Sequence, residues 1–162
     1  MNKVLRILEE NARYTNEEIA MMTGQTAVEV AEEIDRLEKD GVIRGYKAIV
    51  DRDRLSDEMP NMVSAIIELR VTPKRDAGFD EIAEKIAQYS EVEDVYLMSG
   101  GYDLALTITA KSFKDIALFV SQRLATLDSV LSTATHFILS RYKEKGVVLH
   151  TGQTDEREGN WF

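Results

Sequence analysis

One short stretch of the sequence carries groups suited to binding a small molecule that has both a negative and a positive charge. Glycines have no Cβ, so their amides let an anionic carboxylate approach closely. An aspartate in the same stretch could pair with an ammonium group, and together these groups suit an α-amino acid. The same letters also fit a hairpin turn at the two glycines, stabilised by the aspartate. We therefore expect either an effector-binding loop or a plain turn at Met98, Ser99, Gly100, Gly101, Tyr102 and Asp103.

The residue types needed for catalysis or for metal binding are scarce. The chain has no cysteine and two histidines, His136 and His150. The lack of thiols excludes a disulfide scaffold, a thiolate metal site and a cysteine nucleophile. A lone histidine lacks the partners for a metal centre or a catalytic triad, and we expect His136 to lie at a subunit contact. The sequence thus predicts no catalytic residue, no metal site and no cofactor.

Three helical patterns follow one another in the first 45 residues. The segments Thr15–Glu18 and Thr26–Glu29 have the spacing of capping boxes, and each opens a helix. Gly24 ends the second helix, because glycine tolerates positive φ. Two helices joined by such a turn predict a helix-turn-helix, whose last helix fits the major groove of DNA. A plain three-helix packing module is the alternative.

The pattern changes after residue 45. We expect a short strand at 46–50, which would give the helix-turn-helix a small wing, and a linker at 56–61, which contains Pro60. Further along, the order β-α-β-β-α-β predicts a ferredoxin-like sandwich and hence an α+β protein. The expected elements are a strand at 62–71, a helix at 79–89, strands at 92–98 and 104–109, a helix capped by Ser112 that reaches Leu124, and a strand at 130–142.

Composition limits the function further. The 162 residues are 44% hydrophobic and carry a net charge of −9, and such a charge argues against a nucleic-acid binder, whose footprint is usually basic. Residues 1–55 hold nine basic and twelve acidic side chains, so only −3 of that charge lies in the helix-turn-helix unit. We see no secretory signal and no apolar run of membrane-spanning length, and we expect a cytoplasmic protein.

Four segments resemble the Lrp/AsnC family of transcriptional regulators, also called feast/famine regulators. These segments are LRILEENARYTNEEIAMMTG, RLEKDGVIRGYKAIVD, VYLMSGGYDLALTI and VLSTATHFILSRYK. The resemblance covers about residues 2–149 and implies a winged helix-turn-helix DNA-binding domain at 1–55. It implies a ferredoxin-like domain at 62–149 that forms a homodimer, assembles to an octamer and binds an amino acid. Residues 150–162 would form a polar tail.

The resemblance also implies that the SGGYD loop lies at a ligand site between subunits, to which the last strand contributes. Thr133 and Thr135 alternate onto one face of that strand, and their hydroxyls would make suitable polar anchors. The effector would be an amino acid of unspecified identity.

The expected recognition helix departs from the family pattern, because it carries five carboxylates against two cations. Carboxylates facing phosphates would be repelled. In one interpretation they lie away from double-stranded operator DNA, the start of the helix reads bases and cations hold the backbone. In the other, DNA binding has weakened or been lost. The first interpretation assigns base reading to Gln25, Thr26, Ala27 and Val28, and backbone contacts to Arg36, Arg44, Lys47, Arg52 and Arg54.

The leading hypothesis is a DNA-binding regulator of amino-acid metabolism, not an enzyme. An oligomeric amino-acid sensor that does not bind DNA is the second hypothesis, since the recognition helix is acidic. A third is an enzyme resembling the siroheme decarboxylases, which look like Lrp/AsnC proteins. It is weakened because a tetrapyrrole pocket needs histidines and arginines, and 62–89 holds no histidine.

Overall fold

The computed structural model describes residues 2–55, 62–75 and 78–149. The chain divides into two compact units, Met1–Ile49 and Val50–Phe162, and each is described by itself. The predicted linker at 56–61 and the predicted tail at 150–162 lie outside the described residues. Among the described residues, no helix is both long enough and apolar enough to span a bilayer.

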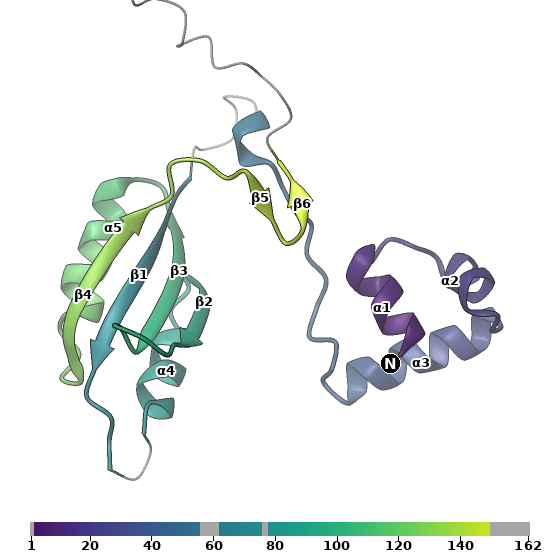
Figure 1. Cartoon of the computed structure of the whole chain (residues 1–162), viewed down its shortest axis with the longest axis horizontal. Coiled ribbons are helices and arrows are strands. Elements are labelled where there is room, and N and C mark those ends of the chain that lie inside the picture. The colour runs from purple at the N-terminus through teal and green to yellow at the C-terminus, as the bar shows by residue number, and fades with distance from the viewer. Residues whose placement is uncertain (1, 56–61, 76–77, 150–162) are drawn as a thin grey trace, which may run out of the picture. The chain divides into compact units, whose positions relative to one another are not determined.

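The first unit consists of the helices α1 (Lys3–Glu10), α2 (Asn16–Thr23) and α3 (Ala27–Lys39) (Figure 1). Both predicted capping boxes are present, at Thr15 with Glu18 and at Thr26 with Glu29. Gly24 ends α2 with φ 77°, the left-handed conformation that favours glycine. One apolar face of each helix meets the others in a small core of Val4, Leu8, Ile19, Ala20 and Val30.

The strand predicted at 46–50 is not formed. The chain has no regular structure there, and the next element is the short 3-10 turn η1 (Arg52–Arg54). Tyr46, Ile49 and Val50 are exposed apolar residues in this segment. A strand exists only when a second segment supplies its backbone partners, and no described residue pairs with this one. The segment therefore forms no strand within the described part of the chain.

The second unit is the predicted ferredoxin-like sandwich. Its elements in chain order are β1 (Val63–Val71), α4 (Asp80–Ala87), β2 (Val92–Leu97), β3 (Leu104–Ala110), α5 (Phe113–Phe119) with the π-helical turn η2 (Val120–Leu124), and β4 (Val130–Phe137). The strands form one antiparallel sheet in the order β2-β3-β1-β4. Both helices cover the same face of the sheet (Figure 1).

Alternation along β1 divides the sheet into two faces. Ala65, Ile67, Leu69 and Val71 are buried in the core, where they lie with Ile82 and Ile86 of α4 and Ile116 and Phe119 of α5. The intervening positions face the other side, which no described element covers. On that open face Ile66 is 41% exposed and Tyr96 of β2 is 51% exposed. His136 of β4 lies 3.0 Å from the Glu68 carboxylate there.

The last strand is shorter than predicted, because β4 ends at Phe137 rather than at residue 142. Its partner β1 begins at Val63, and the last contact between them runs from the Ile138 N–H to the Ser64 carbonyl, 2.9 Å. Residues beyond this point have no backbone partner in β1. They lead instead into a small hairpin that the sequence reasoning missed, β5 (Lys143–Glu144) and β6 (Val147–Val148), with Lys145 and Gly146 at positive φ in its turn.

Candidate functional site

The outward side of α3 is the candidate DNA-reading surface. Val30 and Leu37 are buried, so the opposite side of the helix faces away from the core. Residues spaced three and four apart share a helix face. Four exposed residues therefore form one stripe on this side, the outward stripe: Val28, Glu32, Asp35 and Lys39.

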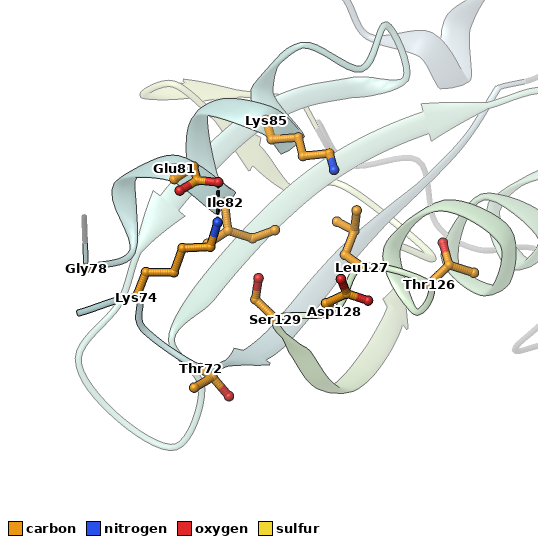
Figure 2. A pocket seen from close by; sticks show the side chains of 10 residues that line it. All are labelled: Thr72, Lys74, Gly78, Glu81, Ile82, Lys85, Thr126, Leu127, Asp128 and Ser129. Carbon is orange, nitrogen blue, oxygen red and sulfur yellow. Dashed lines mark hydrogen bonds and ion pairs between the residues drawn. The ribbon is translucent and has the colours of Figure 1, made fainter. Parts of the chain in front are cut away.

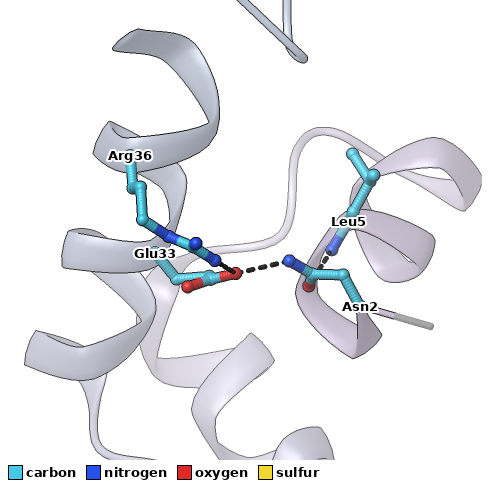
Figure 3. A network of polar contacts seen from close by, with 4 residues as sticks. All are labelled: Asn2, Leu5, Glu33 and Arg36. Atoms are coloured by element: carbon cyan, nitrogen blue, oxygen red, sulfur yellow. Dashed lines mark hydrogen bonds and ion pairs between the residues drawn. The ribbon is translucent and has the colours of Figure 1, made fainter. Parts of the chain in front are cut away.

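Most of the carboxylates of α3 have a partner inside the unit, which reduces the objection to DNA binding. Glu29 accepts from the Thr26 N–H at 2.8 Å, and Asp35 forms an ion pair with Lys39. Glu33 contacts Arg36 at 2.7 Å and also accepts from the Asn2 side chain, which itself caps α1 by accepting from the Leu5 N–H (Figure 3). Glu38 accepts from the hydroxyl of Tyr46 at 2.9 Å.

These contacts also shift the proton affinities of the groups involved. The hydrogen bond from the Thr26 backbone lowers the pKa of Glu29, and the one from Arg36 lowers the pKa of Glu33. The same pairing raises the pKa of Arg36, and the Asp35 carboxylate raises the pKa of Lys39. All four groups are therefore held in their charged forms at neutral pH.

The four residues expected to read bases lie in different environments. Gln25 is exposed, and Val28 is 67% exposed on the outward stripe. Thr26 is exposed, but its hydroxyl accepts from the Glu29 N–H at 3.2 Å and donates to the Glu29 carboxylate at 2.9 Å. Ala27 packs against the core of the unit. Thr26 and Ala27 thus serve the fold in this structure, while Gln25 and Val28 are available to a partner.

The cations expected to hold the DNA backbone are also of two kinds. Arg44 and Lys47 are exposed and belong to the first unit, whereas Arg52 and Arg54 follow the division at residue 49. Arg54 lies 3.2 Å from Asp51 in an ion pair, and Arg36 is paired with Glu33. Their contacts with DNA stay a prediction.

The predicted effector loop lies between β2 and β3 and is fastened to the end of β1 through Asp103. The Asp103 N–H donates to the Leu69 carbonyl at 2.9 Å, and its Oδ2 accepts from the Val71 N–H at 2.9 Å. The Met98 N–H donates to the Asp103 carbonyl at 2.8 Å. Asp103 therefore has the turn-stabilising contacts of the plain alternative, and one of its carboxylate oxygens is already engaged.

The glycines of this loop leave open space beside the backbone. A Cβ placed on Gly100 or Gly101 would meet no atom within 4 Å, and Gly100 has φ 146°. Met98 and Ser99 are exposed, and Tyr102 is half-buried. The free approach to these amides is what the close contact of a ligand carboxylate requires.

Arg70 is a part of this loop site that the sequence reasoning missed. Its Nε donates to the Gly101 carbonyl at 2.9 Å, and its guanidinium carbon lies 5.8 Å from the centroid of the Tyr102 ring. Among the described residues, no carboxylate forms an ion pair with Arg70. An exposed arginine on a strand gives no sequence signal, since the contact depends on the loop folding back over β1.

Thr133 and Thr135 share one face, as their spacing predicts, but they lie apart from the loop. They pair with Leu69 and Ile67, so they face the helix side of the sheet, opposite to Arg70. Leu69 pairs with Leu104 on its other side. Two strand spacings, about 10 Å, therefore separate Thr133 from the end of the loop. Within one chain the two threonines and the glycines do not surround a single small ligand.

A separate cleft of about 200 Å³ opens between α4 and the turn that precedes β4. Lys85 and Asp128 stand on its opposite walls, and Lys74 and Glu81 pair with each other at one side (Figure 2). None of the predicted effector residues lines it. Its volume lies below the usual range of small-molecule sites. Within the described ranges, no three His, Asp or Glu side chains come together as a metal site would require.

Comparison with known proteins covers both units of the chain. Residues 2–44 match the family model for a winged helix-turn-helix DNA-binding domain. Residues 64–148 match the model for the Lrp/AsnC ligand binding domain. The HTH-type transcriptional regulator YugG of Bacillus subtilis (strain 168) is 50% identical over 155 residues, which are 96% of this chain and 92% of YugG.

Solved structures agree with these matches. The structure of PH0061 is similar with a TM-score of 0.73 and 26% identity, over 89% of this chain and 96% of that one. The complex of the transcriptional regulator NMB0573 of Neisseria meningitidis with L-Met is similar with a TM-score of 0.68 and 25% identity, over 88% and 89% of the two chains. The chain therefore belongs to the Lrp/AsnC family of transcriptional regulators, with a winged helix-turn-helix unit followed by the ligand-binding domain of that family.

Proposed function

We propose that the protein is a sequence-specific regulator that binds operator DNA through its first unit and senses an amino acid through its second. The observation that carries the proposal is the match of both units, in this order, to a DNA-binding and a ligand-binding family model. The regulators among its relatives support a role in transcription rather than in catalysis. We place this role in the control of amino-acid metabolism, in the cytoplasm.

DNA binding by a unit with a net charge of −3 must depend on local clusters of positive charge. Arg44 and Lys47 are exposed directly after the helix-turn-helix and would contact phosphates. Such contacts release counterions, so affinity would fall steeply with salt concentration. Several DNA-binding units linked in one oligomer would raise the overall affinity for DNA without new contacts.

For the effector site we assign the ligand carboxylate to the open amides of Gly100 and Gly101 and to the guanidinium of Arg70. The second carboxylate oxygen of Asp103 would accept from the ligand ammonium. The bound L-Met of NMB0573 shows that a relative takes an amino acid with an uncharged side chain.

The site would be completed by another copy of the chain. Thr133 and Thr135 lie about 10 Å or more from the loop in their own chain, so those that contact the ligand would come from a neighbouring subunit. The open face of the sheet supplies a surface for a homodimer, and dimers would assemble further, to an octamer. Ligand binding between subunits would favour one assembly and thereby shift DNA affinity.

Calorimetric titration of the purified chain with each of the twenty amino acids tests the effector site, with the mass followed by light scattering. Gly101→Ala is the sharpest variant, because its Cβ meets no protein atom and occupies only the path of the ligand. We expect it to weaken amino-acid binding at least about tenfold, the loss of one charge-assisted contact. Ser121→Ala, at an exposed position of η2 outside the loop, is the control. Binding unchanged by Gly101→Ala would contradict the site.

A second experiment tests the proposed DNA binding. It measures retention of genomic DNA fragments by the intact oligomer at low salt, with and without the amino acid that calorimetry identifies. We expect salt-sensitive retention that the amino acid changes. An oligomer that binds the amino acid but retains no DNA at low salt would show the sensor without DNA binding instead.

A further inference from the structure

The outward stripe of α3 presents two side chains that no part of their own unit uses. Val28 is 67% exposed and lies in the first turn of the helix. Glu32, one turn further, is exposed and forms neither a hydrogen bond nor an ion pair with any described residue. The next two members of the stripe, Asp35 and Lys39, are paired with each other. The half of the stripe nearest the turn of the helix-turn-helix is thus an apolar surface followed by a free carboxylate.

These two groups have defined complements in the major groove. The C5-methyl group of thymine is the apolar feature of that groove, and the N4 amino group of cytosine is a donor that a glutamate can accept. Val28 and Glu32 are four residues apart, which is about 6 Å along the helix axis. Successive bases rise about 3.4 Å along one strand, so the two side chains span about two base steps.

The charge of Glu32 limits where it can lie in a complex. Beside phosphates it would be repelled, and Lys39, the one cation of the stripe, is already paired with Asp35. Against an amino group at the edge of a base it would be paired. Of these two placements in the groove, only the second avoids the repulsion.

We propose that α3 reads its operator by placing Val28 against a thymine methyl group and Glu32 on a cytosine amino group about two base steps away. This inference rests on the proposed function, since it requires that the first unit binds DNA. It assigns base-specific roles to the two unoccupied positions of the stripe, and it assigns Thr26 to the capping of the helix rather than to the bases.

Selection of binding duplexes from a randomised double-stranded library tests the assignment, with the full chain at low salt. We expect wild-type duplexes to share a thymine and a cytosine at the stated spacing. Glu32→Gln should move the preference at the cytosine position to adenine, because glutamine pairs with the adenine edge. Glu9→Gln removes the same charge from an exposed position on α1 and should leave the selected sequence unchanged.

Replacing the selected thymine with deoxyuridine removes only the methyl group. We expect this exchange to weaken wild-type binding about fourfold, the effect of one buried methyl group, and to have no effect on Val28→Ala. The helical signal of circular dichroism shows whether each variant is folded.

Two outcomes would overturn the inference, and they are distinguishable. If duplexes are selected but the wild type binds thymine and uracil equally and Glu32→Gln selects the same sequence, the base assignments are wrong while DNA binding stands. If the folded wild type selects no duplex at all, the proposed function fails and this inference fails with it.

Discussion

Asp103 combines two roles that sequence reasoning had set against each other. Its Oδ2 accepts from the Val71 N–H, as a turn-stabilising residue would do, and its other oxygen remains for a ligand ammonium. The contact with Val71 explains why the loop can hold two glycines and still keep a defined position above Arg70. Structure and ligand binding therefore depend on different properties of the same side chain, its acceptor oxygen and its charge.

Two substitutions of Asp103 separate these properties. Asp103→Ala leaves the Val71 N–H without its partner, and we expect the free energy of unfolding to fall by about 1–3 kcal/mol. Asp103→Asn keeps an acceptor oxygen but loses the charge, so we expect stability near that of the wild type and weakened amino-acid binding. Urea unfolding and calorimetry measure the two effects. Full amino-acid binding by a folded Asp103→Asn would show that Asp103 serves the loop alone.

The helices of the first unit show how far local sequence determines structure. Both capping boxes and the glycine that ends α2 were predicted, because these signals depend on neighbours within four residues. The charges of α3 were not understood in the same way. The pairs of Glu33 with Arg36 and of Asp35 with Lys39 lie within the helix. The contacts of Glu33 with Asn2 and of Glu38 with Tyr46 involve residues outside it, which sequence spacing does not indicate.

The same distinction explains the errors in the strands. The chain order β-α-β-β-α-β, with both helices on one face of the sheet, was predicted together with the shared face of Thr133 and Thr135. The strand predicted at 46–50 is not formed, because the residue types of a segment do not show whether a partner strand is present. The last strand was placed too long because its end is determined by where β1 begins. Arg70 was missed because its role arises only when the loop folds over the sheet.

Capping by Glu29 should make the stability of α3 depend on pH. The hydrogen bonds from Thr26 lower its pKa below the ordinary value of 4.5, so the folded state favours the charged form. The resulting stabilisation is complete above the ordinary pKa and is lost as the pH falls through the lower folded-state value. We expect the melting temperature of the wild type to fall more on acidification than that of Glu29→Gln.

Circular dichroism at neutral pH and at about pH 3 measures this difference in melting temperature. Glu9→Gln is the matched control, since Glu9 is exposed and makes no hydrogen bond with a described residue. An equal loss in the wild type and in both variants would show that Glu29 contributes no pH dependence.

At the scale of the whole molecule, we expect the open face of the sheet to be the contact surface between copies of the chain. One face of the sheet is covered by α4 and α5, while the other exposes Ile66 and Tyr96 around the pair of Glu68 and His136. An exposed substitution on a lone monomer usually changes stability by less than about 0.5 kcal/mol. A charge placed inside an interface between copies would instead be desolvated without a partner.

Ile66→Glu tests this surface. We expect the mass from light scattering to fall from that of an oligomer toward that of the single chain, because the new carboxylate would be buried between subunits. Leu118→Glu is the control, since Leu118 of α5 is 39% exposed, much like Ile66 at 41%, but lies on the helix layer. An oligomer of unchanged mass for Ile66→Glu would exclude the open face as the dimer contact.

Each unit has its own core: the buried apolar residues of one come from positions 4–37, and those of the other from positions 65–124. The two clusters of core residues share no position. Gene recombination could therefore join either unit to a different DNA-binding or ligand-binding domain without repacking its core. In evolution, the DNA specificity and the ligand specificity of one chain can therefore change independently of each other.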